Sequence, residues 1–407
     1  MDSSPTKSSR IELLDALRGS ALMGILLLHA MEHFNFDRFP ANPPSWLESW
    51  DMHTRTAVFY LFSGKAYAIF AMMFGLSFCL IMDGGARRGL DFRGRFVWRL
   101  CVLAVFGYFL SLIYYDEVLS LLAVLGLLLV VLYKASTRLL VILSVVLLLQ
   151  LPFFWQLARI TVDPTYTPLH LNVEGYHHTL SNAIARGQLM EVCKVNATTG
   201  LWARWAYFIE TGRCLQMLGL FIWGLLLGRS RIFKNAEASV RMAWHALIWG
   251  VIGLIALYLL KHGVASFVMS DVQRNIIGHL FVSYYDLTQM VIWTSCFVLL
   301  YHGTPIRKIL RLFAPAGRTS LSGYAGQSIV GVILFYPFGL GLYRYWGQFY
   351  SFLFGIAFFV LQCAAAHLWM SRFNYGPLEW LWRCCTYLTF QTPFRRRPAQ
   401  EPAGMQS

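Results

Sequence analysis

Ten apolar runs constrain this chain more than any other feature, because a run of about 20 apolar residues matches the hydrocarbon thickness of a bilayer. They cover residues 13–31, 57–82, 96–115, 117–133, 138–157, 205–228, 242–260, 279–301, 320–339 and 347–370. Of the 407 residues, 57% are hydrophobic and 13% are charged, whereas soluble globular proteins carry about 25% charged residues. We therefore predict an all-α, polytopic integral membrane protein with about ten transmembrane helices.

The basic residues gather in alternate loops between these runs. They form six clusters, at Lys7/Arg10, Arg87/Arg88/Arg93/Arg95, Lys134/Arg138, Arg229/Arg231/Lys234/Arg241, Arg307/Lys308/Arg311/Arg318 and Arg395–Arg397. Because cytoplasmic loops carry the excess of Lys and Arg, this pattern predicts that both termini are cytoplasmic. The formal net charge of +14 is then an orientation signal, and we predict no nucleic-acid partner.

We predict one transmembrane domain over residues 1–391. Its longest outer loop covers residues 158–204, and the partial helical periodicity of residues 182–195 predicts one short interfacial helix there. The last residues, 392–407, read TPFRRRPAQEPAGMQS. This composition is typical of a disordered basic tail.

The first run, RIELLDALRGSALMGILLLHAMEHF (residues 10–34), carries ionisable residues near both ends. Arg18 and His29 are eleven residues apart, which puts them on one face of a helix and about 16 Å apart along its axis. Asp15 is three residues before Arg18 and can pair with it. Ionisable groups inside a membrane are functional candidates. The alternative places Arg18 among the inner headgroups and His29 at the outer interface.

Two further basic residues lie early in apolar runs. Lys65 follows Gly64, and a helix break at this glycine would put the lysine at a water-filled cavity; otherwise Lys65 reaches the outer interface. Glu210 and Arg213 are three residues apart and can form a structural pair. In the other interpretation, Arg213 faces a cavity that it shares with the first run.

Neutral polar residues give weaker candidates. Gln327 and Ser328 are adjacent in the ninth run, where they can contact a substrate. In membrane helices such residues more often bond a neighbouring helix.

Five blocks of the sequence resemble the successive signatures of a known family. They read LDALRGSALMGILLLH, GKAYAIFAMMFGLSF, DEVLSLLAVLG, GRTSLSGYAGQSIVG and GPLEWLWRCCTY. In this order they resemble the YeiB-like bacterial membrane proteins, catalogued as domain of unknown function 418. The resemblance covers nearly the whole chain and implies a location in the bacterial cytoplasmic (inner) membrane.

The first helix is also similar to that of the acyltransferase-3 family and, more loosely, of the heparan-glucosaminide N-acetyltransferase group. Acyltransferase-3 proteins carry an Arg-x10-His signature, and Arg18 and His29 reproduce its spacing. YeiB-like members commonly have Asn at the position of His29, which brings this chain closer to the enzymatic relatives. Two other departures are Leu122, where members often have Tyr, and Gly323, where Asn is common.

These relatives imply transmembrane acyl transfer from acyl-CoA to a glycan, lipid or secreted metabolite. In this hypothesis His29 is the general base or itself carries the acyl group briefly. Arg18, together with Arg213, binds anionic parts of the donor, and Lys65 stabilises the oxyanion. Asp15, Gln327 and Ser328 complete the substrate contacts. The sequence has no metal-ligand spacing, so we predict no metal and no bound cofactor.

Two other hypotheses stay open. A transporter or exporter of a small anionic or lipid-linked molecule would use the same buried charges as its pathway. A non-catalytic partner of an envelope-assembly complex would give no evident reason for both Arg18 and His29. The membrane lipids are partners in every case, and the sequence names no protein partner.

Overall fold

The computed structural model describes residues 12–36, 39, 43–163, 165–265, 267 and 269–396. Within these residues every regular element is a helix, apart from one antiparallel bridge between Phe373 and Arg395. The predicted all-α class is confirmed. Lys7 and Arg10, the first predicted basic cluster, lie outside the described residues.

The elements of the first half are α1 (Glu12–Leu28), η1 (His29–Phe34), α2 (Ser45–Phe62), α3 (Lys65–Ala86), α4 (Arg93–Ile113), α5 (Leu119–Leu132), α6 (Thr137–Leu148), α7 (Leu151–Val162), α8 (Val173–Ala185), α9 (Leu189–Val195) and η2 (Asn196–Gly200). Those of the second half are α10 (Leu201–Glu210), α11 (Arg213–Ser230), η3 (Ile232–Lys234), α12 (Ala236–Ala265), α13 (Asp271–Gly303), α14 (Arg307–Leu310), α15 (Phe313–Arg318), α16 (Ser320–Phe335), η4 (Leu342–Arg344), α17 (Gln348–Arg372) and α18 (Pro377–Tyr387).

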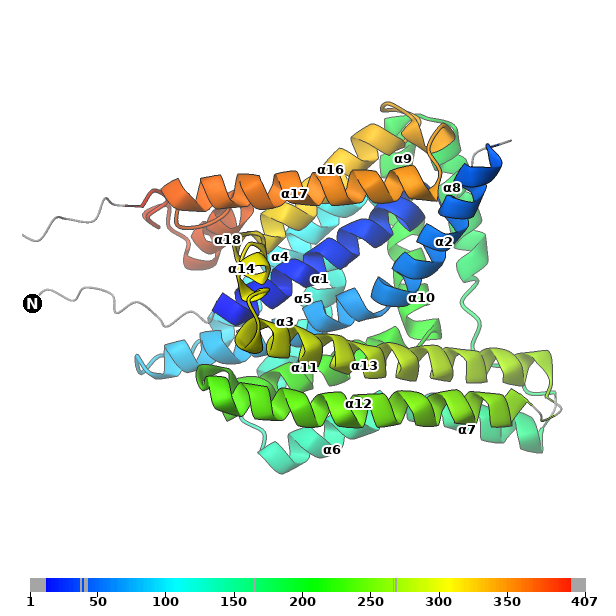
Figure 1. The fold of residues 1–407 in the computed structure, drawn as a ribbon, viewed down its shortest axis with the longest axis horizontal. Coiled ribbons are helices and arrows are strands. Elements are labelled where there is room, and N and C mark those ends of the chain that lie inside the picture. Colours follow the sequence, from blue (N-terminus) through cyan, green and yellow to red (C-terminus); the bar gives the residue numbers. More distant parts are fainter. Residues whose placement is uncertain are drawn as a thin grey trace, which may run out of the picture.

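The long helices run roughly along the longest axis of the molecule, with α17 on one side, the α12–α13 hairpin on the other, and α1 between them (Figure 1). Most residues of α1 are buried within the protein, whereas α12 exposes large apolar side chains such as Ile248, Trp249 and Leu259. A helix that is apolar all round and exposed suits contact with lipid. The first apolar run is therefore central to the fold, and α12 is peripheral.

In the part of the chain that the structure describes, five helical segments are long and apolar enough to cross a membrane, or seven when each of two bent helix pairs is counted as one span. The chain is therefore a polytopic membrane protein, with fewer clear spans than the ten that we predicted. Two predicted spans are short helices, since α5 has 14 residues and α16 has 16. A third predicted span, residues 279–301, lies in α13, whose charged and polar residues, among them Asp286, lower its mean hydropathy.

Breaks divide several of the apolar runs. The sixth is split at Gly212 (φ +72°), where the helical segments on either side meet at 74°. The fifth is split into α6 and α7, which meet at 45°. Discontinuous helices at membrane depth are tolerated where protein surrounds them, and they commonly border binding sites.

The outer loop departs from its prediction. We expected one interfacial helix in residues 182–195, but the chain forms α8 and α9 on either side of Gly187. The φ of Gly187 is +72°, a conformation that ends a helix and favours glycine.

The predicted disordered tail starts at Thr392, but the chain is folded back as far as Arg396. Phe394 packs against the rings of Phe373 and Trp380, and the backbone N–H of Arg396 donates to the carbonyl of Arg372 at 3.0 Å. Residues 397–407 lie outside the described part of the chain.

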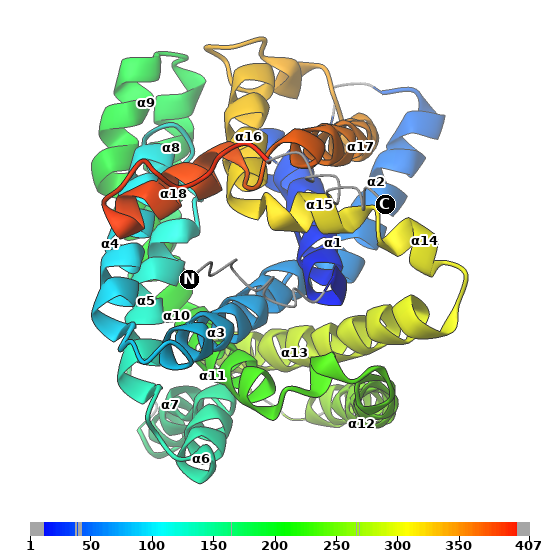
Figure 2. The same ribbon diagram turned by 90° about the vertical axis from the view of Figure 1, so that its left-hand side faces the viewer.

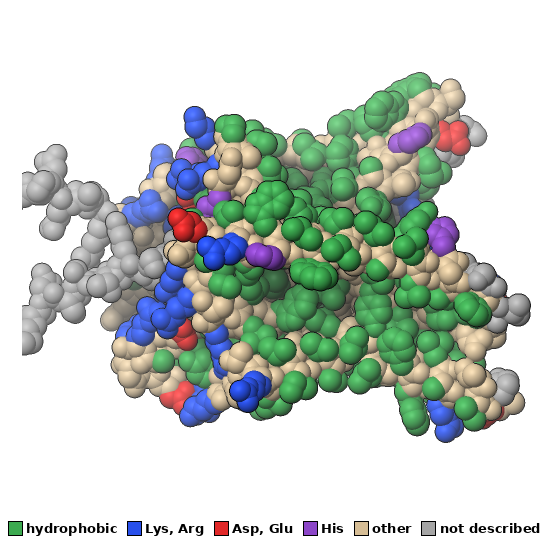
Figure 3. All heavy atoms as spheres, turned by 60° about the horizontal axis from the view of Figure 1, so that its bottom comes forward, with side chains coloured by type: hydrophobic (Ala, Val, Ile, Leu, Met, Phe, Trp, Pro, Cys, Tyr) green, Lys and Arg blue, Asp and Glu red, His purple; other side chains and the backbone are tan. Residues whose placement is uncertain are grey.

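Lys and Arg side chains gather at the end of the molecule where α14 and α18 lie, on the left of Figure 3. We call it the basic end. It carries Arg95, Arg307 and Arg383 among others. Figure 2 views the molecule from this end and shows α18 lying across α4 and α16. The opposite end carries η1, α8 and α9 (Figure 1).

Two glycines allow α15 to lie directly on α1. A Cβ on Gly19 would be 2.2 Å from the carbonyl oxygen of Phe313, and one on Gly317 would be 1.8 Å from that of Asp15. Small residues permit this close backbone approach between membrane helices. The contact brings the carbonyl of Gly317 to the inner face of α1, beside Arg18.

Candidate functional site

Arg18 is held by three elements near the basic end. Its guanidinium donates to Ser77 Oγ of α3 at 2.7 Å, to Asp15 Oδ1 at 3.3 Å and to the carbonyl of Gly317 at 3.5 Å. The predicted pairing of Asp15 with Arg18 is present. Arg18 is thus fixed to the helices around it, and its side chain keeps only 19% of its exposure.

His29 lies where α1 changes into the π-helix η1. His29 is 8% exposed. Its ring packs against Tyr114, which directly follows α4, and against Tyr324 of α16, with centroid distances of 5.2 Å and 5.9 Å. Nδ1 of His29 is buried and has no hydrogen-bond partner among the described residues. π-helical turns occur frequently at functional sites. This one places the unpaired imidazole nitrogen beside a cluster of polar side chains.

The cluster contains two residues that we did not single out from the sequence. His33 lies one helical turn after His29, with ring centroids 5.2 Å apart, and its Nε2 is 2.9 Å from Asp116 Oδ2. Glu32 is the next nearest acid, 3.7 Å from the same nitrogen. We call His29, His33 and Asp116 the histidine cluster.

Asp116 belongs to the loop between α4 and α5, outside the spanning helices. Burial raises the pKa of the Asp116 carboxyl. The attraction to His33 and the hydrogen bond between them outweigh burial and lower this pKa to about 2. The pairing with His33 therefore favours the ionised form of the Asp116 carboxyl.

A second, fully buried ion pair holds this loop. Arg204 Nη1 of α10 donates to the carbonyl of Glu117 at 2.6 Å and lies 3.3 Å from its carboxylate. The same carboxylate accepts hydrogen bonds from the backbone N–H groups of Leu119 and Ser120 at the start of α5. Because its neighbour in the chain is anchored in this way, Asp116 has a defined position against His33.

Lys65 lies at a break between α2 and α3, as the glycine before it predicted. Gly64 has φ +75°, and a Cβ there would be 1.7 Å from Asp286 Oδ2. Lys65 Nζ is buried and lies 3.0 Å from Asp286 Oδ1 of α13. The break therefore joins a lysine to a carboxylate in an enclosed pair.

Arg213 begins α11 at the other break and stacks between two tyrosines. Its guanidinium carbon is 5.1 Å from the ring centroid of Tyr67 and 5.3 Å from that of Tyr207. The predicted pairing with Glu210 is wrong, because Glu210 turns toward His170 Nδ1, 2.9 Å away. Glu210 ends α10, and the sharp bend at Gly212 separates the two side chains.

Arg213 acts electrostatically on both the histidine cluster and the Lys65–Asp286 pair. Its charge acts on His33 and on Asp286. Tyr67 beside it donates to Gln216 Oε1, and Gln216 Nε2 donates to the carbonyl of Ser283 on α13 at 3.0 Å. The charge of Arg213 therefore reaches both the Lys65–Asp286 pair and the histidine cluster, and a cavity shared by Arg213 and the first run stays a prediction.

Gln327 and Ser328 make contacts that bind helices together. Gln327 Nε2 donates to Gln362 Oε1 of α17 at 2.7 Å, and Ser328 Oγ donates to the carbonyl of Tyr324 in its own helix at 3.1 Å. Tyr324 in turn packs against His29. These two residues therefore support the wall of the histidine cluster rather than pointing at His29.

The histidine cluster also has the donor set of a metal site. His29, His33 and Asp116 each offer one ligand atom, and these atoms lie within 4.8 Å of one another. Imidazole and carboxylate ligands suit divalent transition metals. We predicted no metal from the sequence, and the three residues provide a place where that prediction can be tested.

A signal for this cluster was present in the sequence. His29 and His33 are four residues apart and so share a helix face. Asp116 and Glu117 are adjacent acids between two apolar runs. What the sequence lacked was the pairing of those two segments, since the loop between α4 and α5 is far from η1 in the chain.

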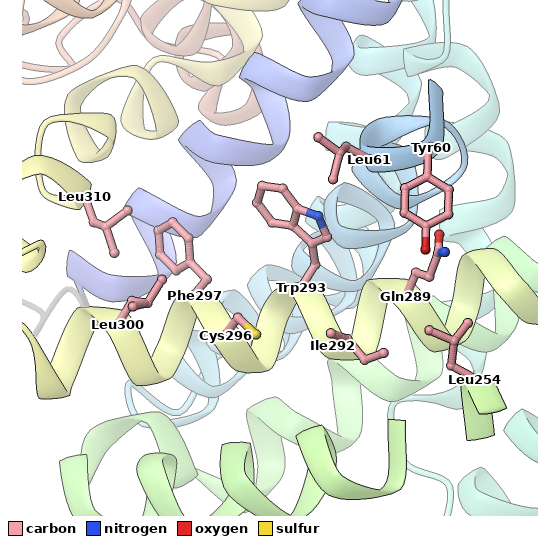
Figure 4. Close-up of a pocket in the computed structure, with 10 residues that line it drawn as sticks. All are labelled: Tyr60, Leu61, Leu254, Gln289, Ile292, Trp293, Cys296, Phe297, Leu300 and Leu310. Carbon is pink, nitrogen blue, oxygen red and sulfur yellow. The ribbon is translucent and has the colours of Figure 1, made fainter. Parts of the chain in front are cut away.

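An apolar groove of about 470 Å³ lies between α2, α12 and α13, away from the histidine cluster (Figure 4). Trp293, Phe297 and Ile292 line it, and Tyr60 and Gln289 lie at one end. Its lining is suited to hydrocarbon and offers few polar groups for recognition.

The chain is similar along nearly its whole length to three curated proteins. It is 26% identical to "Uncharacterized protein YxaH" of Bacillus subtilis (strain 168), over 94% of this chain and 96% of the relative. It is 25% identical to "Uncharacterized 39.9 kDa protein in amylase 3'region" of Bacillus acidopullulyticus, over 93% and 94%. It is 23% identical to "Uncharacterized protein YeiB" of Escherichia coli (strain K12), over 92% and 95%.

A family match covers the second part of the chain. Residues 227–389, from the end of α11 to α18, match the family described as "Protein of unknown function (DUF418)". No solved structure matches the chain. These findings confirm the expected resemblance to YeiB-like proteins, and none of the relatives' names states an activity.

Proposed function

We propose that this chain, whose residues 227–389 match the DUF418 family, is a membrane-bound acyltransferase that moves an acyl group from acyl-CoA to a glycan, lipid or secreted metabolite. The observation that carries the proposal is His29, whose buried Nδ1 has no partner among the described residues and lies beside the His33–Asp116 pair. An imidazole with a free nitrogen in a polar cluster is the usual device for acid–base catalysis.

The proposed topology has ten spans in the bacterial cytoplasmic membrane, with both termini in the cytoplasm. The gathering of Lys and Arg at one end of the molecule (Figure 3) supports this orientation. In this orientation the basic end faces the cytoplasm, where acyl-CoA is made. The histidine cluster then lies toward the outer side of the membrane. Short helices α5 and α16 and the polar α13 supply the spans that length and hydropathy leave out.

The proposed reaction begins when the acceptor's hydroxyl or amine gives its proton to His29. The acceptor's oxygen or nitrogen then attacks the thioester carbon and forms the new ester or amide bond. The carbon–sulfur bond breaks, and the leaving thiolate takes the proton from His29, which restores the free imidazole. Asp116 fixes His33, and His33 orients His29 by its charge and ring contact.

The contacts support different roles for the other candidates. Arg213 is the candidate cation nearest in effect to the reacting groups, because its charge reaches His33 and its neighbours are tyrosine rings. Lys65 is bound to Asp286 at 3.0 Å, which favours a positioning role over an oxyanion contact. Asp15 holds Arg18 at the donor side, and Gln327 and Ser328 position Tyr324 beside His29.

A transporter of a small anionic or lipid-linked molecule is the second candidate. The enclosed Lys65–Asp286 pair at a helix break favours it, because paired charges at broken helices mark transport pathways. Transport would need no covalent step and no donor.

The test uses membrane vesicles from cells that produce the full chain, since these contain the native acceptors. Radiolabelled acetyl-CoA is supplied to the basic side, and label is counted in the lipid, glycan and soluble fractions. We expect label in one fraction together with release of free CoA, and loss of both in His29→Ala. Labelling that is undiminished in His29→Ala would contradict the assignment. Movement of an unmodified solute without acetyl-CoA would favour the transporter.

A further inference from the structure

Where α18 crosses α4 at the basic end, two indole N–H groups fix the helices to each other. Trp98 Nε1 donates to the carbonyl of Cys385, and Trp382 Nε1 donates to the carbonyl of Arg99, both at 2.9 Å. Figure 2 shows α18 lying across this end of the molecule. The two hydrogen bonds run in opposite directions between the helices, so the crossing is a defined joint.

Three arginines converge on this crossing, and we call Arg95, Arg99 and Arg383 the arginine cluster. The guanidinium carbon of Arg99 is 3.5 Å from the ring centroid of Trp382. The ring of Tyr387 faces both Arg95, at 5.2 Å, and Arg383, at 5.7 Å. Stacking on aromatic rings holds a guanidinium plane in place while its edge N–H groups stay available for an anion.

No carboxylate neutralises this cluster among the described residues. None of the three arginines forms an ion pair there, although Arg99 and Arg383 are close enough to act on one another's charge. The nearest acid of α18 is Glu379, whose oxygens accept hydrogen bonds from the N–H groups of Leu321 and Ser322 at the start of α16. The charge of Glu379 reaches Arg99, but its oxygens are already bonded to α16, so one carboxylate faces three guanidinium groups.

Two buried donors in the cluster have no partner in the described part of the chain. Nε of Arg99 and Nε of Arg383 are enclosed and make no hydrogen bond within the described part of the chain. Buried polar groups are nearly always bonded, and an exception needs an explanation. Three like charges, two of them with an enclosed, unbonded N–H, are explained by an anion that sits between them.

We propose that the arginine cluster binds the phosphate group of an anionic ligand. Guanidinium forks match phosphate oxygens in pairs, and one carboxylate would leave most of the charge of three arginines unbalanced. Two sources can supply the phosphate at this end of a membrane protein, namely the headgroup of an anionic phospholipid and a soluble phosphate or diphosphate ester. The proposal does not depend on catalysis at His29.

The test measures binding by the purified full chain with two probes. Inorganic pyrophosphate is titrated by calorimetry, as the soluble source. Retention of phosphatidylglycerol is measured by native mass spectrometry after release from nanodiscs that contain equal parts of phosphatidylglycerol and phosphatidylcholine, as the lipid source. The variant is Arg99→Gln/Arg383→Gln. The matched control is Arg307→Gln, because Arg307 lies at the same end and also stacks on an aromatic ring, 5.3 Å from Tyr301.

We expect at least one probe to bind, with affinity or retention reduced about tenfold or more in the double variant and unchanged in Arg307→Gln. Pyrophosphate binding identifies a soluble ligand, and selective retention of phosphatidylglycerol identifies a lipid. Arg99→Lys tests whether the paired geometry matters, because it keeps the charge and loses the fork; it should reduce binding while the protein keeps its elution volume and melting temperature. Absence of binding by both probes, or an equal loss in Arg307→Gln, would overturn the proposal.

Discussion

At one end of α1, Arg18 donates hydrogen bonds to Ser77 Oγ at 2.7 Å and to Asp15 Oδ1 at 3.3 Å. At the other end, His29 Nδ1 is enclosed and has no partner among the described residues. Both residues lie in the same buried helix, but the first is saturated with protein contacts and the second is not. A buried polar atom without a partner carries a free-energy cost, so the histidine end has a reason to accept a substrate that the arginine end lacks.

This difference separates two meanings of an ionisable residue in a membrane helix. Arg18 joins α1, α3 and α15, and its removal should be felt first as lost stability. His29 Nδ1 makes no hydrogen bond to any described residue, and removal of His29 should be felt first as lost activity.

The largest effect is expected for His29→Ala. General base catalysis contributes about 10²- to 10⁴-fold to a rate, so acyl transfer in membrane vesicles should fall by that factor while the melting temperature changes little. His367→Ala is the matched control, because His367 is an exposed histidine of the spanning helix α17 and should transfer label at the wild-type rate. If both variants lose activity equally, His29 has no special role.

The next effect concerns the Lys65–Asp286 pair. Asp286→Ala would leave a buried ammonium group unpaired, which costs about 3–5 kcal/mol. We expect a large drop in thermal stability, measured by tryptophan fluorescence, and recovery of most of it in Lys65→Met/Asp286→Leu. Asp15→Ala should cost much less, because Arg18 keeps Ser77 and Gly317 as partners. Equal losses in the two single variants would show that the buried pair is no more tightly coupled than the Arg18 end.

How far the sequence predicts this site depends on the distance between the partners in the chain. The Asp15–Arg18 pair and the break at Gly64 follow from local spacing and from glycine's φ, and both are present. Glu210 and Arg213 have similar spacing, but the bend at Gly212 parts them. A single glycine does not indicate whether a helix will continue or turn by 74°.

The contacts that make the histidine cluster could not be read from one sequence. His33 meets Asp116, and Lys65 meets Asp286, only because α1, α4, α3 and α13 pack in a particular arrangement. Periodicity specifies which face of a helix is apolar, but it does not specify which helix that face meets. The ten apolar runs therefore predicted the class of fold and the polar candidates, while the structure supplied their partners.

A smaller effect is expected at Asp116. Asp116→Asn removes the charge that holds His33, and misplacement of a catalytic group can lower a rate by up to about 10²-fold. Stability should change little, because the loop is held by Glu117 and Arg204 rather than by Asp116. Glu117→Gln is the opposite control and should lower the melting temperature. Activity unchanged in Asp116→Asn would remove His33 and Asp116 from the mechanism.

The smallest effect is expected for Arg18→Lys, and it decides what the arginine end does. Lysine keeps the positive charge but cannot reach Ser77, Asp15 and Gly317 together as the guanidinium does, and losing a charged hydrogen bond costs about 1.5–3 kcal/mol. If Arg18 serves the fold, the melting temperature falls and the KM for acetyl-CoA stays constant. If Arg18 also contacts the donor, KM rises while kcat is kept, because the lost contact is then one made to bound donor and transition state alike. Measuring both quantities on one preparation separates the two roles, and a rise in KM alone would mean that the two ends of α1 act on one substrate about 16 Å apart.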